Sequence, residues 1–369
     1  GCDDASDCRG GWSCSGVAWG PGSISACNWP PVGATTISEV DLGMTTLGAG
    51  SVLVPSVSLI VPTDSVSTPL RAQMVSGDSL PFTFYSTSAP SGLEVYSVNE
   101  LSMLIDQHVR WIPGNDYEAI AMLIPNGSPG RVILGESFTY EPGPYTFSVA
   151  AYERMAGDTG SVGLHLSALV KRAPGAVVTS GTLDLAIHLV GVGVTAAAAP
   201  GDARVGAFVG RLDMLLAQVG IRVGAVTYHD VTAGALAVID STDGPTSELA
   251  QLFRLSAGRS GNVASIFLVR GVNAGGDGFN TLGVAGGIPG PTGIHGTMSS
   301  GVVVAFDPAV VGAGTTGGRF AGHVGAHELS HFLGLFHTTE RLAACGPGGM
   351  PPACAPFGSP DTISDTTRG

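Results

Sequence analysis

Apolar side chains recur at steps of three and four residues after Asp202, and this spacing predicts an amphipathic helix that packs on a sheet. Asp202 stands at the expected N-cap position, and Gly220 stands where the helix should end. Further helices are predicted from Ser247 to about Ala257 and over Arg319–Leu333. Short apolar runs predict strands over Leu183–Val190, Ile221–Tyr228, Ser265–Arg270, Leu282–Ala285 and Gly301–Phe306. Strands that alternate with helices predict an α/β domain over residues 175–369.

The preceding part of the chain has no long helical spacing. Its short runs are rich in β-branched and aromatic residues and are separated by Pro, Gly, Asn and Ser. We expect strands over Ser51–Val61, Phe82–Tyr85, Leu93–Val98, Ala119–Ile124, Arg131–Leu134 and Tyr145–Ala151. This pattern predicts an all-β sandwich over residues 36–174. The turn residues at Ala173–Gly175 mark its end, so we expect the sandwich to be separable from the α/β domain.

The six cysteines of the chain fall into two groups. Residues 1–35 hold Cys2, Cys8, Cys14 and Cys27 and form a predicted disulfide-held segment, whose four cysteines permit three connectivities. Cys345 and Cys354 lie in a Gly- and Pro-rich stretch and are predicted to pair with each other. Paired cysteines indicate an oxidising compartment, so we expect a secreted or cell-surface protein of bacterial type. Gly1-Cys2 is compatible with a lipid anchor, and a thiolate that caps a metal is a weaker alternative role for one N-terminal cysteine.

Composition excludes some function classes. Only 12% of the 369 residues are charged, and the net charge of −13 disfavours a nucleic-acid partner. The most apolar segment, Leu183–Ala199, contains Asp184 and His188 and alternates as a strand does, so we expect no transmembrane segment. The sequence says nothing about oligomeric state.

The strongest chemical signal is the run His327-Glu328-Leu329-Ser330-His331-Phe332-Leu333-Gly334-Leu335-Phe336-His337, with the spacing H-E-x-x-H-x-x-G-x-x-H. Residues four apart share one face of a helix, so His327 and His331 can present their imidazoles to one point. Gly334 can adopt the left-handed conformation that ends a helix, and His337 can then return as a third ligand. Three imidazole nitrogens suit Zn²⁺ and leave a position open for water. Glu328 is the candidate general base, whereas His323, one turn earlier, is predicted not to be a ligand.

This run resembles the signature of the metzincin zinc endopeptidases. Three further segments resemble the pappalysin-like group of that family: Leu282–Ala285 with Ile288-Pro289, Gly301–Val304, and Asp361–Thr366. The resemblance covers about residues 180–369. It implies a mixed twisted sheet, a zinc-binding helix, and an extended substrate that pairs with the edge strand near Leu282–Ala285. Asp361 and Asp365 are candidate Ca²⁺ ligands, with a solvated acidic loop as the alternative.

Two positions depart from the family pattern. Ser330 stands where the pappalysin-like group has Gly, and no Met-turn is recognisable, since Met350 lies in a proline-rich loop. The resemblance therefore implies that the chain stops before that turn, with an incomplete C-terminal subdomain. The sequence predicts a zinc-dependent endopeptidase that hydrolyses peptide bonds of extracellular proteins. The alternative is a surface adhesion or binding protein that carries an inactive protease-like domain; the intact Glu328 argues against it.

Overall fold

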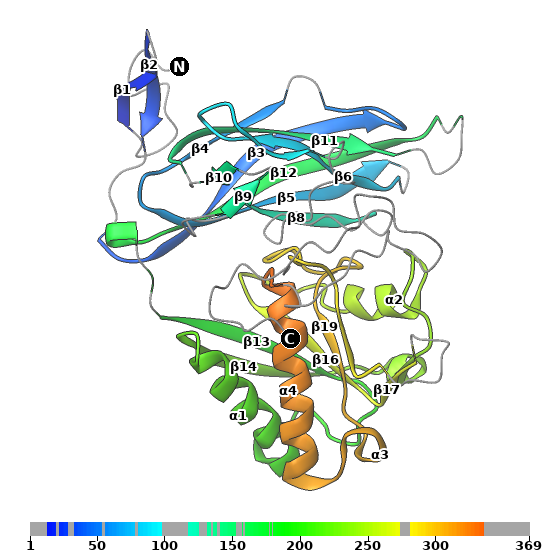
Figure 1. The fold of residues 1–369 in the computed structure, drawn as a ribbon. Helices are drawn as coiled ribbons and strands as arrows, with labels where there is room; N and C mark the ends of the chain where they lie inside the picture. The colour runs from blue at the N-terminus through cyan, green and yellow to red at the C-terminus, as the bar shows by residue number, and fades with distance from the viewer. Residues whose placement is uncertain are drawn as a thin grey trace.

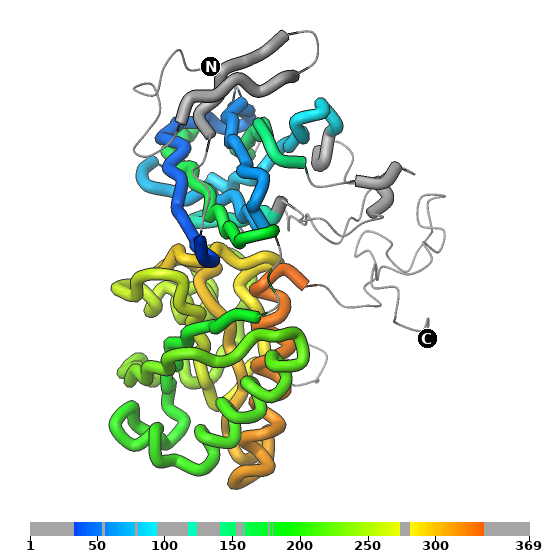
Figure 2. The backbone as a smooth tube through the Cα atoms, turned by 90° about the vertical axis from the view of Figure 1, so that its left-hand side faces the viewer, coloured from blue at the N-terminus to red at the C-terminus, as the bar shows by residue number. Residues whose placement is uncertain are grey.

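The computed structural model describes two parts of the chain, a β-sandwich and an α/β domain (Figures 1 and 2). It also describes an N-terminal hairpin. Beyond that hairpin, the described residues are 33–53, 56–77, 80–97, 117–124, 131–133, 136–138, 141–152, 157, 159–176, 178, 180–273 and 281–335. In both views the sandwich lies against one end of the α/β domain.

The sandwich consists of two antiparallel four-stranded sheets. One has the order β4-β11-β6-β7 and the other β3-β12-β5-β8. Their facing sides share one hydrophobic core, to which Leu59 and Phe147 contribute from the first sheet and Leu70 and Leu164 from the second. The strand bounds are β3 (Thr36–Gly48), β4 (Val57–Val61), β5 (Ser65–Gly77), β6 (Phe82–Ser88), β7 (Glu94–Ser97), β8 (Ala119–Ile124), β11 (Gly143–Ala151) and β12 (Ser161–Arg172), with a separate pair β9 (Arg131–Ile133) and β10 (Glu136–Phe138).

Three of the longest sandwich strands, β3, β5 and β12, were not predicted from the sequence. β3 alternates exposed with partly buried residues, and polar residues or glycine separate its apolar side chains. β5 contains Pro69 and the buried cation Arg71, both unusual inside a strand. The expected strand Ser51–Val61 is shortened to Val57–Val61. Pairing across the sheet, rather than local composition, gives these segments their extended form.

The N-terminal hairpin places two of the four N-terminal cysteines at paired backbone positions. β1 (Ser13–Trp19) and β2 (Gly22–Asn28) pair antiparallel, and their register sets Cys14 opposite Cys27. The disulfides expected in this segment stay a prediction.

The α/β domain has a five-stranded sheet of order β14-β13-β16-β19-β18, in which only β18 runs antiparallel to its neighbour. Alternate residues along the central strands face opposite layers. Ile266 and Leu268 pack toward α1 and α4, and Phe267 and Val269 toward α2. The elements are β13 (Gly181–Leu189), α1 (Ala203–Ala217), β14 (Ile221–Asp230), β15 (Val238–Ile239), α2 (Glu248–Arg254), β16 (Ala264–Val269), β17 (Gly271–Val272), β18 (Gly283–Ala285), β19 (Val302–Ala305), α3 (Pro308–Val311) and α4 (Gly314–Phe332), with short 3-10 turns at Pro174–Ala176, Ala199–Gly201 and Gly234–Ala237.

The helix caps agree with the sequence. The Asp202 carboxylate accepts hydrogen bonds from the backbone N–H groups of Arg204 and Val205, and Ser247 caps α2 through Ala250. Within the described residues no helix has both the length and the apolar character needed to cross a bilayer.

Helix α4 begins five residues earlier than predicted. Its glycines Gly322 and Gly325 face α1: a methyl group on Gly322 would lie 2.6 Å from the Phe208 carbonyl oxygen, and one on Gly325 would lie 3.0 Å from the Phe208 ring. A methyl group on Gly318 would likewise lie 2.2 Å from the Arg204 carbonyl oxygen. The glycines therefore bring two helix backbones together, and this contact sets the position of the site-bearing helix.

Candidate metal centre

The side chains of His327 and His331 converge one turn apart on α4. Their Nε2 atoms are 3.2 Å apart and their rings are nearly perpendicular, at 84°. His327 is exposed, whereas His331 is 8% exposed. The pair thus presents two ring nitrogens to one point near the C-terminal end of α4.

A backbone carbonyl orients His331. Its Nδ1 lies 2.7 Å from the Leu335 carbonyl oxygen, so Nδ1–H donates and Nε2 keeps its lone pair. Leu335 reaches this position because Gly334 has φ +102°, in the region that glycine alone adopts without strain. Gly334 thus has the positive φ expected from the sequence. Its turn also supplies a carbonyl partner for the Nδ1 of His331, a candidate ligand.

The pair fits a zinc ion. Two nitrogen ligands about 2.0–2.1 Å from one zinc at the tetrahedral angle would lie about 3.3 Å apart. The observed 3.2 Å between the Nε2 atoms is close to that separation. Within the described residues no three His, Cys, Asp or Glu side chains gather into a metal site. The predicted third ligand, His337, lies outside the described residues, as do Asp361, Asp365, Met350 and the Cys345–Cys354 pair.

Glu328 lies beside the edge strand β18. The residue is 8% exposed. Burial raises the pKa of its carboxyl group to about 7, and a hydrogen bond with the Ala285 backbone opposes this shift. A methyl group on Gly283 would lie 2.6 Å from the Glu328 Cγ and 3.0 Å from its Oε1. The edge strand therefore holds the carboxyl group on one side, and only glycine at position 283 leaves room for it. A glycine inside a predicted strand is the sequence signal for such an approach.

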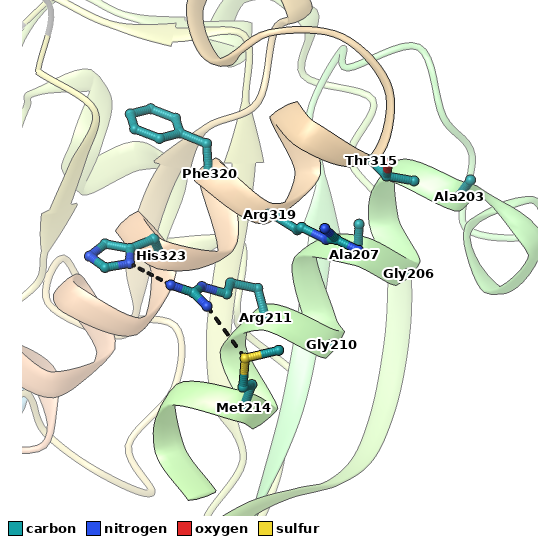
Figure 3. A pocket seen from close by; sticks show the side chains of 10 residues that line it. All are labelled: Ala203, Gly206, Ala207, Gly210, Arg211, Met214, Thr315, Arg319, Phe320 and His323. Carbon is teal, nitrogen blue, oxygen red and sulfur yellow. Dashed lines mark hydrogen bonds between the residues drawn. The ribbon is translucent and has the colours of Figure 1, made fainter. Parts of the chain in front are cut away.

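His323 lies in a different place. It lines a groove of about 850 Å³ between α1 and α4, with its Nδ1 3.5 Å from the Arg211 guanidinium (Figure 3). Small residues of α1 form one wall, and Arg319 and Phe320 of α4 form the other. His327, Glu328 and His331 are not among the lining residues. The groove is therefore separate from the candidate metal centre.

A second histidine pair was not singled out by the sequence. His188 on β13 and His229 on β14 stand opposite each other in the parallel register, with ring centroids 5.2 Å apart. His188 is 2% exposed and stacks on Phe267 at 4.3 Å. The Arg259 guanidinium lies 2.9 Å from the His229 Nε2. No spacing motif links these residues, because adjacent strands bring them together.

Comparison with known proteins leaves the family open. No family model matches the chain, and no curated protein matches it. Among solved structures, metalloproteinase-II from Bacteroides fragilis is similar at a TM-score of 0.28 and 14% identity, over 47% of this chain and 53% of that one. The infectious bursal disease virus VP2 subviral particle matches at a TM-score of 0.23 and 14% identity, over 44% of this chain and 39% of that one. An acetyl xylan esterase from Butyrivibrio proteoclasticus matches at a TM-score of 0.20 and 10% identity, over 63% of this chain and 64% of that one.

The chain spans about half the length of the metalloproteinase and less of the viral protein. These overall similarities are too low to carry an argument about fold or function. The functional argument therefore rests on the residues of the site.

Proposed function

We propose that the chain is a zinc-dependent endopeptidase of a secreted or cell-surface type. The observation that carries the proposal is the convergence of the His327 and His331 Nε2 atoms at 3.2 Å, on the helix that also places Glu328 beside an edge strand. His337 would be the third ligand. Zinc held there would supply Lewis acidity toward the scissile carbonyl and the attacking water.

The chain's own residues would do the remaining work. The Glu328 carboxylate would take a proton from the attacking water and deliver it to the nitrogen of the leaving amine. β18 is the last strand of its sheet in the described residues, so an extended substrate could add to its outer edge through backbone hydrogen bonds. Asp361 and Asp365 would be the place to look for a structural Ca²⁺ ion.

The test is the Glu328→Gln variant, which keeps the shape of the side chain and removes the base. We expect unchanged zinc stoichiometry by metal analysis. We expect cleavage of an unfolded protein substrate to fall by about 10²–10⁴-fold. Glu248→Gln is the matched control, because Glu248 accepts a backbone hydrogen bond from Asp240 within the same domain. A zinc-free unmutated chain in zinc-containing buffer, or undiminished cleavage by Glu328→Gln, would contradict the proposal.

A further inference from the structure

The loop Gly286–Ser300, between β18 and β19, crosses the end of the zinc-site helix. The Gly290 backbone N–H donates to the Phe332 carbonyl oxygen over 2.9 Å. A methyl group on Gly290 would lie 2.0 Å from the Phe332 ring, so the loop backbone rests directly on α4. At its start, the Gly286 N–H donates to the Gly301 carbonyl oxygen over 2.9 Å and closes the loop. The position of this loop therefore bears on both the edge strand and the helix end.

Glu118, at the start of the sandwich strand β8, binds this loop from the other domain. Its Oε2 accepts a hydrogen bond from the Met298 backbone N–H at 2.8 Å. Its Oε1 accepts from the Arg254 guanidinium at the end of α2, at 2.8 Å from Nε and 2.5 Å from Nη2. The Glu118 and Arg254 side chains are 20% and 31% exposed. One partly buried carboxylate thus joins the sandwich, α2 and the loop.

A second contact reinforces the first. Arg71 on β5 donates from Nη1 to the Thr292 carbonyl oxygen at 3.0 Å, and Nη2 binds Ser167 and Glu39. The Arg71 side chain is 3% exposed. Gly293 has φ +78°, and a methyl group there would lie 2.9 Å from the Arg71 Nη1. The loop therefore closely approaches a buried cation whose other partners belong to the sandwich.

The sandwich also reaches the turn after α4. A methyl group on Gly334 would lie 3.7 Å from the Leu123 Cδ2 of β8 and 3.7 Å from the Pro289 Cβ of the loop. Gly334 is the residue that brings the Leu335 carbonyl to His331. Residues of the sandwich, the loop and the metal-site turn therefore meet at one place.

We propose that the β-sandwich fixes the position of the loop Gly286–Ser300 beside the zinc-site helix, and that Glu118 is the positioning residue that holds this loop. The catalytic part of this proposal rests on the peptidase function proposed above. The chain passes from the sandwich to the α/β domain at Pro174–Ala176. The two domains are thus joined covalently there and by the hydrogen bonds of Glu118 and Arg71 to the loop.

The test is hydrogen exchange of the full chain without substrate, comparing Glu118→Gln with Glu141→Gln. A glutamine amide offers one acceptor oxygen, so Glu118→Gln loses its bond either to Arg254 or to the Met298 N–H. Glu141 accepts a backbone hydrogen bond from Ser91 inside the sandwich at 3.0 Å and makes a matched control. We expect Glu118→Gln to raise the exchange of peptides from the loop by about tenfold, with zinc stoichiometry unchanged. Arg254→Met, which removes the cation that binds Glu118, should also raise the hydrogen exchange of the loop peptides.

Two outcomes would overturn the inference: loop exchange unaltered in both Glu118→Gln and Arg254→Met, or an equal rise in Glu141→Gln. Peptide cleavage is the second measurement, and there we expect Glu118→Gln to lower kcat/KM by about tenfold without zinc loss. A loop response in a chain that binds no zinc would support the role proposed for the sandwich and contradict the peptidase function. Zinc-dependent cleavage by a chain whose loop exchange does not change in the variants would support the peptidase function and contradict the role proposed for the sandwich.

Discussion

The two histidine pairs of the α/β domain have similar ring spacing but different chemistry. Ring centroids are 4.6 Å apart for His327 and His331 and 5.2 Å apart for His188 and His229. The first pair directs two Nε2 atoms at each other on the helix that also carries Glu328. In the second pair, His188 stacks on Phe267, its Nε2 has no hydrogen-bond partner among the described residues, and Arg259 approaches His229.

The difference shows what makes a pair of imidazoles fit for a metal. A cation is favoured where lone pairs converge near a carboxylate, and disfavoured beside a guanidinium in an apolar layer. Burial, with smaller contributions from His229, Arg259 and His295, lowers the pKa of His188 to about 3. His188 is therefore a neutral part of the core, whereas His229 is only partly buried.

The largest expected effect is on metal content. His331→Ala should lose zinc, because the remaining imidazoles hold the ion far less well. His229→Ala, which removes one imidazole from the other pair, should keep full stoichiometry by metal analysis. Zinc retained at full occupancy by His331→Ala, or lost from His229→Ala, would reverse the assignment of the two pairs.

The second-largest effect is expected in the pH dependence of the stability of the fold, which involves His188. The folded-state pKa of His188 is below the unfolded value of about 6.5, so the unfolded chain binds the extra proton as pH falls. Stability is therefore lost progressively between about pH 6.5 and pH 3, by up to about 5 kcal/mol. His188→Phe keeps a ring on Phe267 and removes the titration. Its urea unfolding, with zinc chelated in both proteins, should depend less on pH than that of the unmutated chain; equal pH dependence would show that His188 is protonated in the folded state.

A smaller effect is expected from crowding the carboxyl group of Glu328. Gly283→Ala places a methyl group against Glu328 and should lower peptide cleavage by about 10–100-fold, about 1.4–2.7 kcal/mol, while zinc stays bound. Gly271→Ala is the control, because a methyl group there would meet no atom of the described residues within 4 Å. If the two variants cleave equally well, the contact with β18 does not position Glu328.

The smallest effect should come from Ser330, between the two histidines proposed as ligands. Its hydroxyl donates to the Ala326 carbonyl oxygen at 2.7 Å, a bond within the helix that touches neither imidazole. Ser330→Ala should change stability by less than about 0.5 kcal/mol and leave zinc content as it was. A loss of zinc would mean that the serine helps to set the angle between the histidines.

The amino-acid sequence by itself determined the local features. The histidine spacing, the positive φ at Gly334, the caps at Asp202 and Ser247, and the strand Ala119–Ile124 all follow from interactions between residues close in the chain. Helix periodicity alone places His327 and His331 on one face. The sheet-rich architecture of several domains also followed from short runs of β-branched and aromatic residues, separated by turn residues, and from the helical spacing after Asp202.

Only the tertiary structure decided the remainder, because those features depend on contacts between residues distant in sequence. Glycines on α4 meet α1 rather than the sheet, and Gly283 meets Glu328 across 45 residues. His188 and His229 become neighbours through parallel strand pairing, and Glu118 reaches Met298 from another domain. A local pattern records which side a residue faces but not which partner it finds there. The partner depends on how helices, sheet and sandwich pack together.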